Sequence, residues 1–222
     1  MISTKDIPQS GGGIPKVIQP GNRNAKVNSI VLEPYTYKAG SLHLILNLET
    51  APIEGFVGFN IVKDNDSKGT YKGQIGKVSS DQWAYSDGVT KGGRQVSRDI
   101  EIMKFLQDFC KNLGIMDWFN AQDNKHETIE SFVSALNKER PFKDVYLNWC
   151  IAGKEYEGKG GYKNYNLFLP KYVKNEVSFE SEDVKESESK LTKFNESLHI
   201  IRSKPKVVES FGTTASGDDF EM

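Results

Sequence analysis

The stretch LHLILNLE, residues 42–49, decides the fold class. Leucine occupies every second position, and His43, Ile45, Asn47 and Glu49 fall between the leucines. Because successive side chains of a strand point to opposite faces, this period of two predicts a strand with one face in a core and the other near solvent. The starting expectation is therefore a β-rich domain.

Further strands are expected on either side of this one. KVNSIVLEPY (26–35) is rich in β-branched residues, which favour strands. GFVGFNIVK (55–63) predicts a third strand that bends at its glycines, and TYKGQIGKV (70–78) continues the sheet. The last two strands are expected at 145–153 and 162–173.

Helices are expected between the third and fourth strands. Apolar residues recur at helical spacing from Ser97, a suitable N-cap, to Gly114, a suitable C-cap, and a second helix is predicted at 127–137. This order is that of an OB-fold, a five-stranded Greek-key barrel with its helix between strands three and four. An α+β domain with an open sheet would produce the same order.

Composition divides the chain into three parts: a flexible lead at 1–25, a domain at 26–174 with a helical insertion at about 97–138, and an acidic, largely disordered tail at 175–222. The tail holds an excess of Asp and Glu over Lys and Arg, whereas the body is mildly basic. A basic body with an acidic end suits a protein that holds a polyanion.

Several classes of protein are disfavoured. No apolar run reaches the ~20 residues of a membrane span, and the first fifteen residues lack the apolar stretch of a signal peptide. The two cysteines, Cys110 and Cys150, lie in apolar runs and are expected to be buried thiols in a reducing compartment.

Catalytic and cofactor motifs are incomplete. Residues 153–160 approach the phosphate loop GxxxxGK[ST] but place Gly160 where the magnesium-binding hydroxyl is needed. Residues 64–75 begin like a calcium loop but end on Ile75, where a bidentate Glu is required. The three histidines are scattered. We therefore expect no metal, no cofactor and no catalytic residue, and a protein that is not an enzyme.

Aromatic, basic and glycine residues are interleaved in the expected turns. Single-stranded nucleic acid is bound by cations along the phosphates and by rings on which unpaired bases stack. Trp149 and Phe168 alternate with polar neighbours inside strands and are assigned to the core instead. The candidate contacts are Tyr35, Tyr37, Lys38, Lys72, Lys77, Trp83, Tyr85, Arg94, Lys154, Tyr156, Lys159, Tyr162 and Lys163.

The body also resembles the single-stranded DNA-binding proteins of tailed bacteriophages, most closely those of crAss-like phages. The stretches that carry the resemblance are KVNSIVLEPYTYKAGSLHLILNLET, GTYKGQIGKVSSDQWAYSDG, FLQDFCKNLGIMDWFNAQDNKHETIESF and FKDVYLNWCIAGKEYEGKGGYKNYNLFLPK, within residues 26–174. The resemblance implies an OB-type domain that coats and protects replication or recombination intermediates in the host cytoplasm without catalysis.

The C-terminus looks like the acidic end of bacterial single-stranded DNA-binding proteins, which docks into replication or recombination partners. Asp218, Asp219 and Phe220 correspond in kind, although the chain lacks the preceding proline and ends in Glu-Met. An acidic tail could instead compete with DNA for the basic groove.

The sequence therefore predicts sequence-independent binding of single-stranded DNA. Two alternatives stay open. A virion or assembly protein would use the aromatic loops for contacts with another protein, and an RNA-binding protein would use the same surface with added contacts to the 2′-hydroxyl. The oligomeric state does not follow from the sequence.

Overall fold

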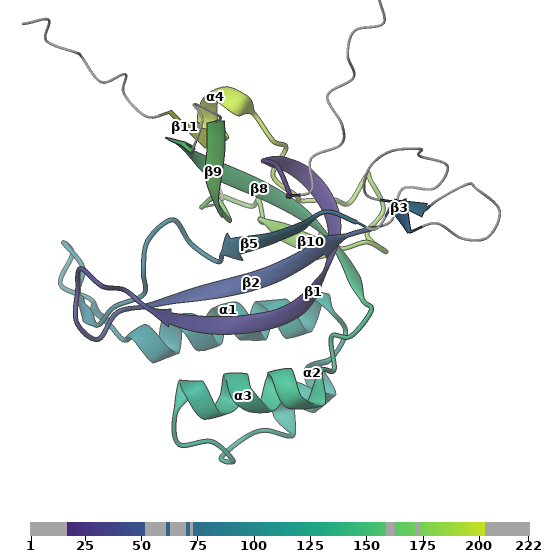
Figure 1. Ribbon diagram of the computed structural model, residues 1–222. Helices are drawn as coiled ribbons and strands as arrows, with labels where there is room; N and C mark the ends of the chain where they lie inside the picture. The colour runs from purple at the N-terminus through teal and green to yellow at the C-terminus, as the bar shows by residue number, and fades with distance from the viewer. Residues whose placement is uncertain are drawn as a thin grey trace, which may run out of the picture.

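Five strands close into a barrel in the computed structural model, which describes residues 17–51, 61–62, 70–71, 73–158, 163–171 and 174–202 (Figure 1). The barrel strands are β1 (Gly21–Pro34), β2 (Leu42–Thr50), β5 (Ile75–Ser79), β8 (Tyr146–Glu157) and β9 (Lys163–Phe168). Neighbours pair in the order β1, β2, β5, β9, β8 and back to β1. Only β5 and β9 are parallel; the other four pairs are antiparallel. This confirms the expected OB-like Greek-key barrel.

The alternating leucines of β2 face the barrel interior as predicted. Leu44, Leu46 and Leu48 are fully buried, whereas His43 and Asn47 on the other face are partly exposed. Trp149 and Ile151 of β8 meet them inside the barrel. Burial of this continuous apolar layer stabilises the closed sheet.

The third barrel strand differs from the expected one. It is β5 (Ile75–Ser79), which overlaps the expected stretch 70–78, and not 55–63. Two short strands, β3 (Ile61–Val62) and β4 (Thr70–Tyr71), pair with each other in a separate sheet. Most of 55–63 lies outside the described residues.

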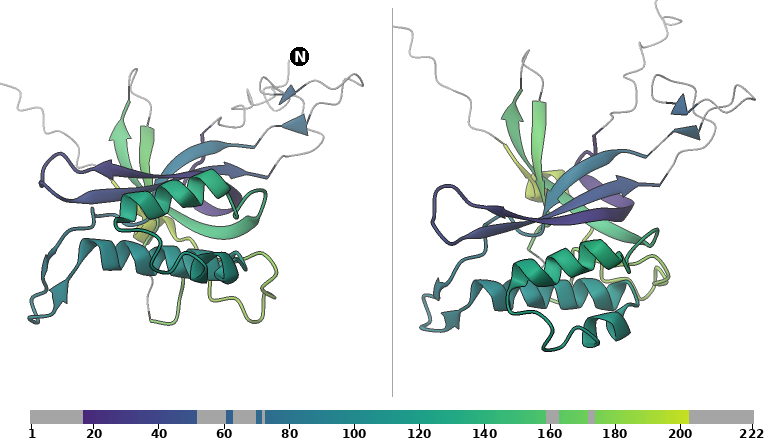
Figure 2. Two further views of the ribbon diagram at one scale, coloured as in Figure 1. Left: turned by 90° about the horizontal axis from the view of Figure 1, so that it is seen from below. Right: turned by 60° about the horizontal axis from the view of Figure 1, so that its bottom comes forward.

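Helices cover one side of the barrel (Figure 2). The helices α1 (Arg98–Asn112) and α3 (Ile129–Glu139) occur close to their predicted ranges, and the short helix α2 (Met116–Asn120), which the periodicity did not reveal, connects them. Gly114 adopts a φ of 71°, the left-handed conformation expected after a helix. The buried face of α1, with Leu106 and Phe109, closes the core.

The domain extends beyond both of its predicted boundaries. The strand β1 begins at Gly21, and before it Ile18 is only 1% exposed and donates its N–H to the carbonyl of Ile75 at 3.0 Å. Residues 17–25 are therefore part of the domain and not of a flexible lead. The rest of the expected lead, residues 1–16, lies outside the described residues.

Residues 177–202, predicted to be largely disordered, complete the sheet around β8. The strand β10 (Phe179–Ser181) pairs with β8 beyond the end of β9, and β11 (Ile200–Ile201), which follows the one-turn helix α4 (Glu196–His199), pairs with β8 beyond the end of β1. The unpaired edges of a long strand favour this addition. The prediction was wrong here because Glu180, counted as a solvated charge, is buried and accepts hydrogen bonds from the backbone N–H of Lys190 and the hydroxyl of Ser189.

One side chain of α3 protects the open edge of β1. The Asn137 carboxamide accepts a hydrogen bond from the Ile30 N–H at 2.9 Å and donates one to the Ile30 carbonyl at 2.7 Å. We expect Asn137→Ala to lower the free energy of unfolding by about 2 kcal/mol, because both backbone groups lose their partner under the helix. Urea denaturation measures this change. Asn112→Ala, which removes an exposed hydrogen bond to the Asp108 carbonyl, is the control, and an equal loss in both variants would contradict the edge-protecting role.

Candidate nucleic-acid interface

The pairing register places two hairpin ends on either side of one outer surface. Ile45, near the start of β2, pairs with Ser79 at the end of β5, and Ser79 pairs with Phe168 at the end of β9. The start of β9 therefore lies towards the opposite end of the strands from the β1–β2 turn (Figure 1). We call the side of β2, β5, β9 and the adjoining half of β8 that points away from the barrel interior the outer face; the β1–β2 turn and the β8–β9 hairpin flank it.

Rings gather at the β1–β2 turn. Tyr37 is 87% exposed, and its ring meets Tyr35 edge to face with centroids 5.5 Å apart. Tyr35 in turn meets His43 of β2 edge to face at 5.1 Å. The three rings form a series from the exposed turn onto the outer face, and such edge-to-face contacts hold each ring in a defined orientation.

The segment after β5 lies against this turn. Tyr85 and Leu42 exchange backbone hydrogen bonds at 2.8 and 3.0 Å, and the ammonium of Lys38 donates to the hydroxyl of Ser86 at 2.9 Å. Trp83, on the same segment, is 64% exposed. The structure thus brings Tyr35, Tyr37 and Lys38 together with the segment that carries Trp83.

Tyr85 and Arg94 occupy different environments. The ring of Tyr85 is partly buried against the core, and its hydroxyl shares a hydrogen bond with Ser80 at 2.9 Å, so little of this ring is available for stacking. Arg94 is exposed in the short hairpin formed by β6 (Gly88–Val89) and β7 (Gln95–Val96), where its backbone N–H donates to Thr90.

The middle of the outer face holds two buried apolar side chains, Ile45 and Phe168, and beside them an ion pair. The ammonium of Lys77 lies 3.1 Å from the carboxylate of Glu33, and both groups are exposed. His43 lies 3.5 Å from the hydroxyl of Ser79. A phosphate that approached Lys77 would therefore meet a carboxylate as well.

The β8–β9 hairpin separates its predicted contacts between its two faces. Lys154 and Tyr156 share one face, whereas Lys163 is paired in register with Glu157 on the other and forms an ion pair with Glu155 at 3.2 Å. Of the predicted cations on this hairpin that the structure describes, Lys154 is therefore the one without a neighbouring carboxylate partner.

Other predicted site residues lie outside the described residues: Lys72, Lys159, Tyr162, Asp218, Asp219 and Phe220. Sequence reasoning did not select His43, Asn47, Asn164 or Asn166, which the register places on the outer face. The alternation of polar residues along β2 and β9 was the signal for them, since a period of two exposes one face.

Chemically reactive groups are few in the part of the chain that the structure describes. Both thiols are buried as predicted, and burial raises the pKa of Cys110 to about 12 and, with the nearby charge of Glu176, the pKa of Cys150 to about 11. Among the described residues no group of His, Cys, Asp and Glu side chains could hold a metal ion, and none of the described helices has the length and apolar character needed to cross a membrane.

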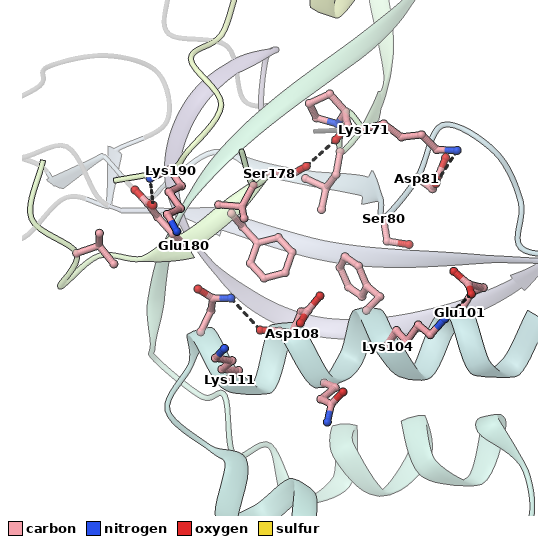
Figure 3. Close-up of a pocket in the computed structure, with 18 of the residues that line it drawn as sticks. Ser80, Asp81, Glu101, Lys104, Asp108, Lys111, Lys171, Ser178, Glu180 and Lys190 are labelled. Atoms are coloured by element: carbon pink, nitrogen blue, oxygen red, sulfur yellow. Dashed lines mark hydrogen bonds and ion pairs between the residues drawn. The ribbon is translucent and has the colours of Figure 1, made fainter. Parts of the chain in front are cut away.

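A groove of about 890 Å³ lies between α1 and residues 177–190 (Figure 3). Its walls carry both signs of charge: Glu101 and Lys104 form an ion pair at 2.7 Å, and Asp81 lies 3.9 Å from Lys171. Asp108 and Glu188 add further carboxylates. The carboxylates of this groove repel the phosphates of a nucleic acid, so the groove is a weaker candidate for a polyanion than the outer face.

Comparison of the chain with protein-family models, with curated proteins and with solved structures found no match.

Proposed function

We propose that this protein binds single-stranded DNA on the outer face, without base sequence specificity and without catalysis, and protects it during phage replication or recombination in the bacterial cytoplasm. Bases stack on exposed rings and lysines neutralise phosphates. The phage setting rests on the resemblance of residues 26–174 given above. An acidic tail that recruits replication partners or competes with DNA belongs to the same proposal.

One observation carries this proposal: exposed rings with unpaired cations beside them lie on both hairpins that flank the outer face. Tyr37 lies next to Lys38 at the β1–β2 turn, and Tyr156 lies on the same face as Lys154 on the β8–β9 hairpin. A flexible single strand can offer unpaired bases to these rings, whereas a rigid duplex keeps its bases stacked inside.

The salt dependence of binding tests the proposal. Of the predicted cations that flank the outer face, Lys38 and Lys154 have no carboxylate partner among the described residues. Two neutralised phosphates predict a slope of log K against log salt of about −1.4 for single strands, or roughly sevenfold weaker binding between 50 and 200 mM salt. Lysines outside the described residues make the slope steeper.

Fluorescence anisotropy with labelled dT, duplex and RNA oligomers measures this slope. We expect dT to bind more tightly than the duplex at every salt concentration. Affinity without salt dependence contradicts the proposal. Capture of another phage protein without any affinity for oligonucleotides supports the virion or assembly alternative, and a preference for RNA over dT identifies an RNA-binding protein.

The carboxylate of Glu33 is expected to weaken binding. Glu33→Gln removes a charge that repels phosphate and frees the ammonium of Lys77, so affinity for dT at low salt should rise about threefold, in line with the small energies of exposed charge pairs. Glu127→Gln changes the net charge equally but lies before α3, on the helical side, and should leave the affinity unchanged. Equal tightening in both variants would mean that only net charge matters.

A further inference from the structure

One face of the β8–β9 hairpin gathers four side chains of complementary chemistry. Tyr156 stands directly opposite Asn164, and Lys154 stands opposite Asn166. Directly opposed residues of an antiparallel pair have Cβ atoms about 5 Å apart and point to the same side. A ring, two carboxamides and an ammonium group therefore form a patch two residues wide and two strands across, which we call the hairpin patch.

The carboxylates of the hairpin are all on the other face. Glu155 is paired with Tyr165 and Glu157 with Lys163, and the Lys163 ammonium contacts the Glu155 carboxylate at 3.2 Å. The alternation Lys-Glu-Tyr-Glu along residues 154–157 thus separates the charges by face. A phosphate can approach the hairpin patch without meeting a carboxylate of the hairpin.

The polar groups of the hairpin patch are available to a ligand. Tyr156 is 43% exposed, and Lys154, Asn164 and Asn166 are exposed. None of these four side chains has a hydrogen-bond or ion-pair partner among the described residues. By contrast, Asn47, an outward carboxamide of β2, already donates to the hydroxyl of Ser29 at 2.8 Å.

The hairpin patch lies at the end of β8 and β9 that is far from the β1–β2 turn. From Asn166 the same side of β9 leads to Phe168, which pairs with Ser79 of β5, and Ser79 pairs with Ile45 of β2. Phe168 and Ile45 are buried, so the hairpin patch is a site separate from the rings of the β1–β2 turn.

We propose that the hairpin patch is a nucleobase subsite, in which Tyr156 stacks on an unpaired base, the carboxamides of Asn164 and Asn166 hydrogen-bond to its edge, and Lys154 holds the adjoining phosphate. The inference rests on the proposed function and assigns Asn164 and Asn166 to it. A carboxamide presents a donor and an acceptor side by side, which matches the donor and acceptor edge of an unpaired base. In a duplex that edge is engaged in base pairing, so the subsite selects single strands.

The test compares two oligomers of equal length: dT, and a chain of abasic nucleotides with the same phosphates. The subsite predicts that the native protein binds dT at least about tenfold more tightly than the abasic chain, because the abasic chain has no base that could stack on Tyr156. It also predicts that the Asn164→Ala, Asn166→Ala double variant loses about tenfold in affinity for dT, as two hydrogen bonds require. Its affinity for the abasic chain should be unchanged.

Asn120→Ala on α2 is the matched control, since it removes an exposed carboxamide on the helical side, and thermal unfolding of each variant verifies the fold. Unchanged affinity of the double variant for dT, or an equal loss on both oligomers, would overturn the subsite while leaving the proposed function standing. Absence of binding to either oligomer by the native protein would refute the proposed function itself, and the subsite with it.

Discussion

Trp149→Ala is expected to lower the free energy of unfolding by about 4 kcal/mol, the cost of removing a large aromatic side chain from a packed core. Trp149 is fully buried, and its ring lies 5.1 Å from Phe179 and 6.4 Å from Phe109. Its indole N–H donates to the carbonyl of Ala25 at 2.9 Å, so the variant also leaves a buried acceptor without its partner. Urea denaturation followed by circular dichroism measures the loss.

Trp83→Ala is the matched control for this variant. Trp83 is largely exposed, and its removal should change the unfolding free energy by no more than about 0.5 kcal/mol. If both tryptophan variants lost the same stability, Trp149 would not hold β1, β8 and β10 together as its contacts indicate.

The contrast between these two tryptophans shows how far the sequence could go. Trp149 was assigned to the core because it alternates with polar residues inside a strand, and the structure confirms this. Trp83 was assigned to a polar stretch and is exposed. Tyr85, two residues later, was grouped with Trp83, yet its ring packs against the core, because the backbone pairing with Leu42 brings it to the barrel. The local pattern of the sequence cannot show a contact between residues that are more than forty positions apart in the chain.

The barrel could be predicted because the signals for its elements are local. The alternation in β2 and the helical spacing in α1 are local signals, and the order of elements limited the possible topologies. The third strand was misplaced because 55–63 is richer in apolar residues than 75–79, whereas the choice between them depends on pairing with β2.

The acidic segment from residue 175 shows a limit of charge counting. Its carboxylates suggested a solvated chain, but Phe179 packs against Trp149 and Phe105, and the strand edges of β8 supply hydrogen-bond partners. Apolar residues spaced between charges were the available signal. Tertiary pairing decided the outcome, since a strand needs a neighbour to satisfy its backbone.

The Tyr37→Ala, Trp83→Ala double variant is expected to lose at least about thirtyfold in affinity for oligo-dT, because each ring that stacks on a base contributes about 1 kcal/mol or more. Both rings are mostly exposed at the β1–β2 end of the outer face, where Lys38 joins the turn to the segment of Trp83. Anisotropy titration measures the loss, and the unfolding free energy should stay within about 1 kcal/mol of the native value.

Leu198→Ala on α4 removes an equally exposed apolar side chain away from the β1–β2 turn and should leave binding intact. The two sites are independent on this view, since stacking at the turn and hydrogen bonding at the β8–β9 hairpin involve different nucleotides. Combining the ring variants with Asn164→Ala should therefore give losses whose free energies add. Full affinity in the double ring variant would mean that the bound DNA does not contact the rings at the β1–β2 turn.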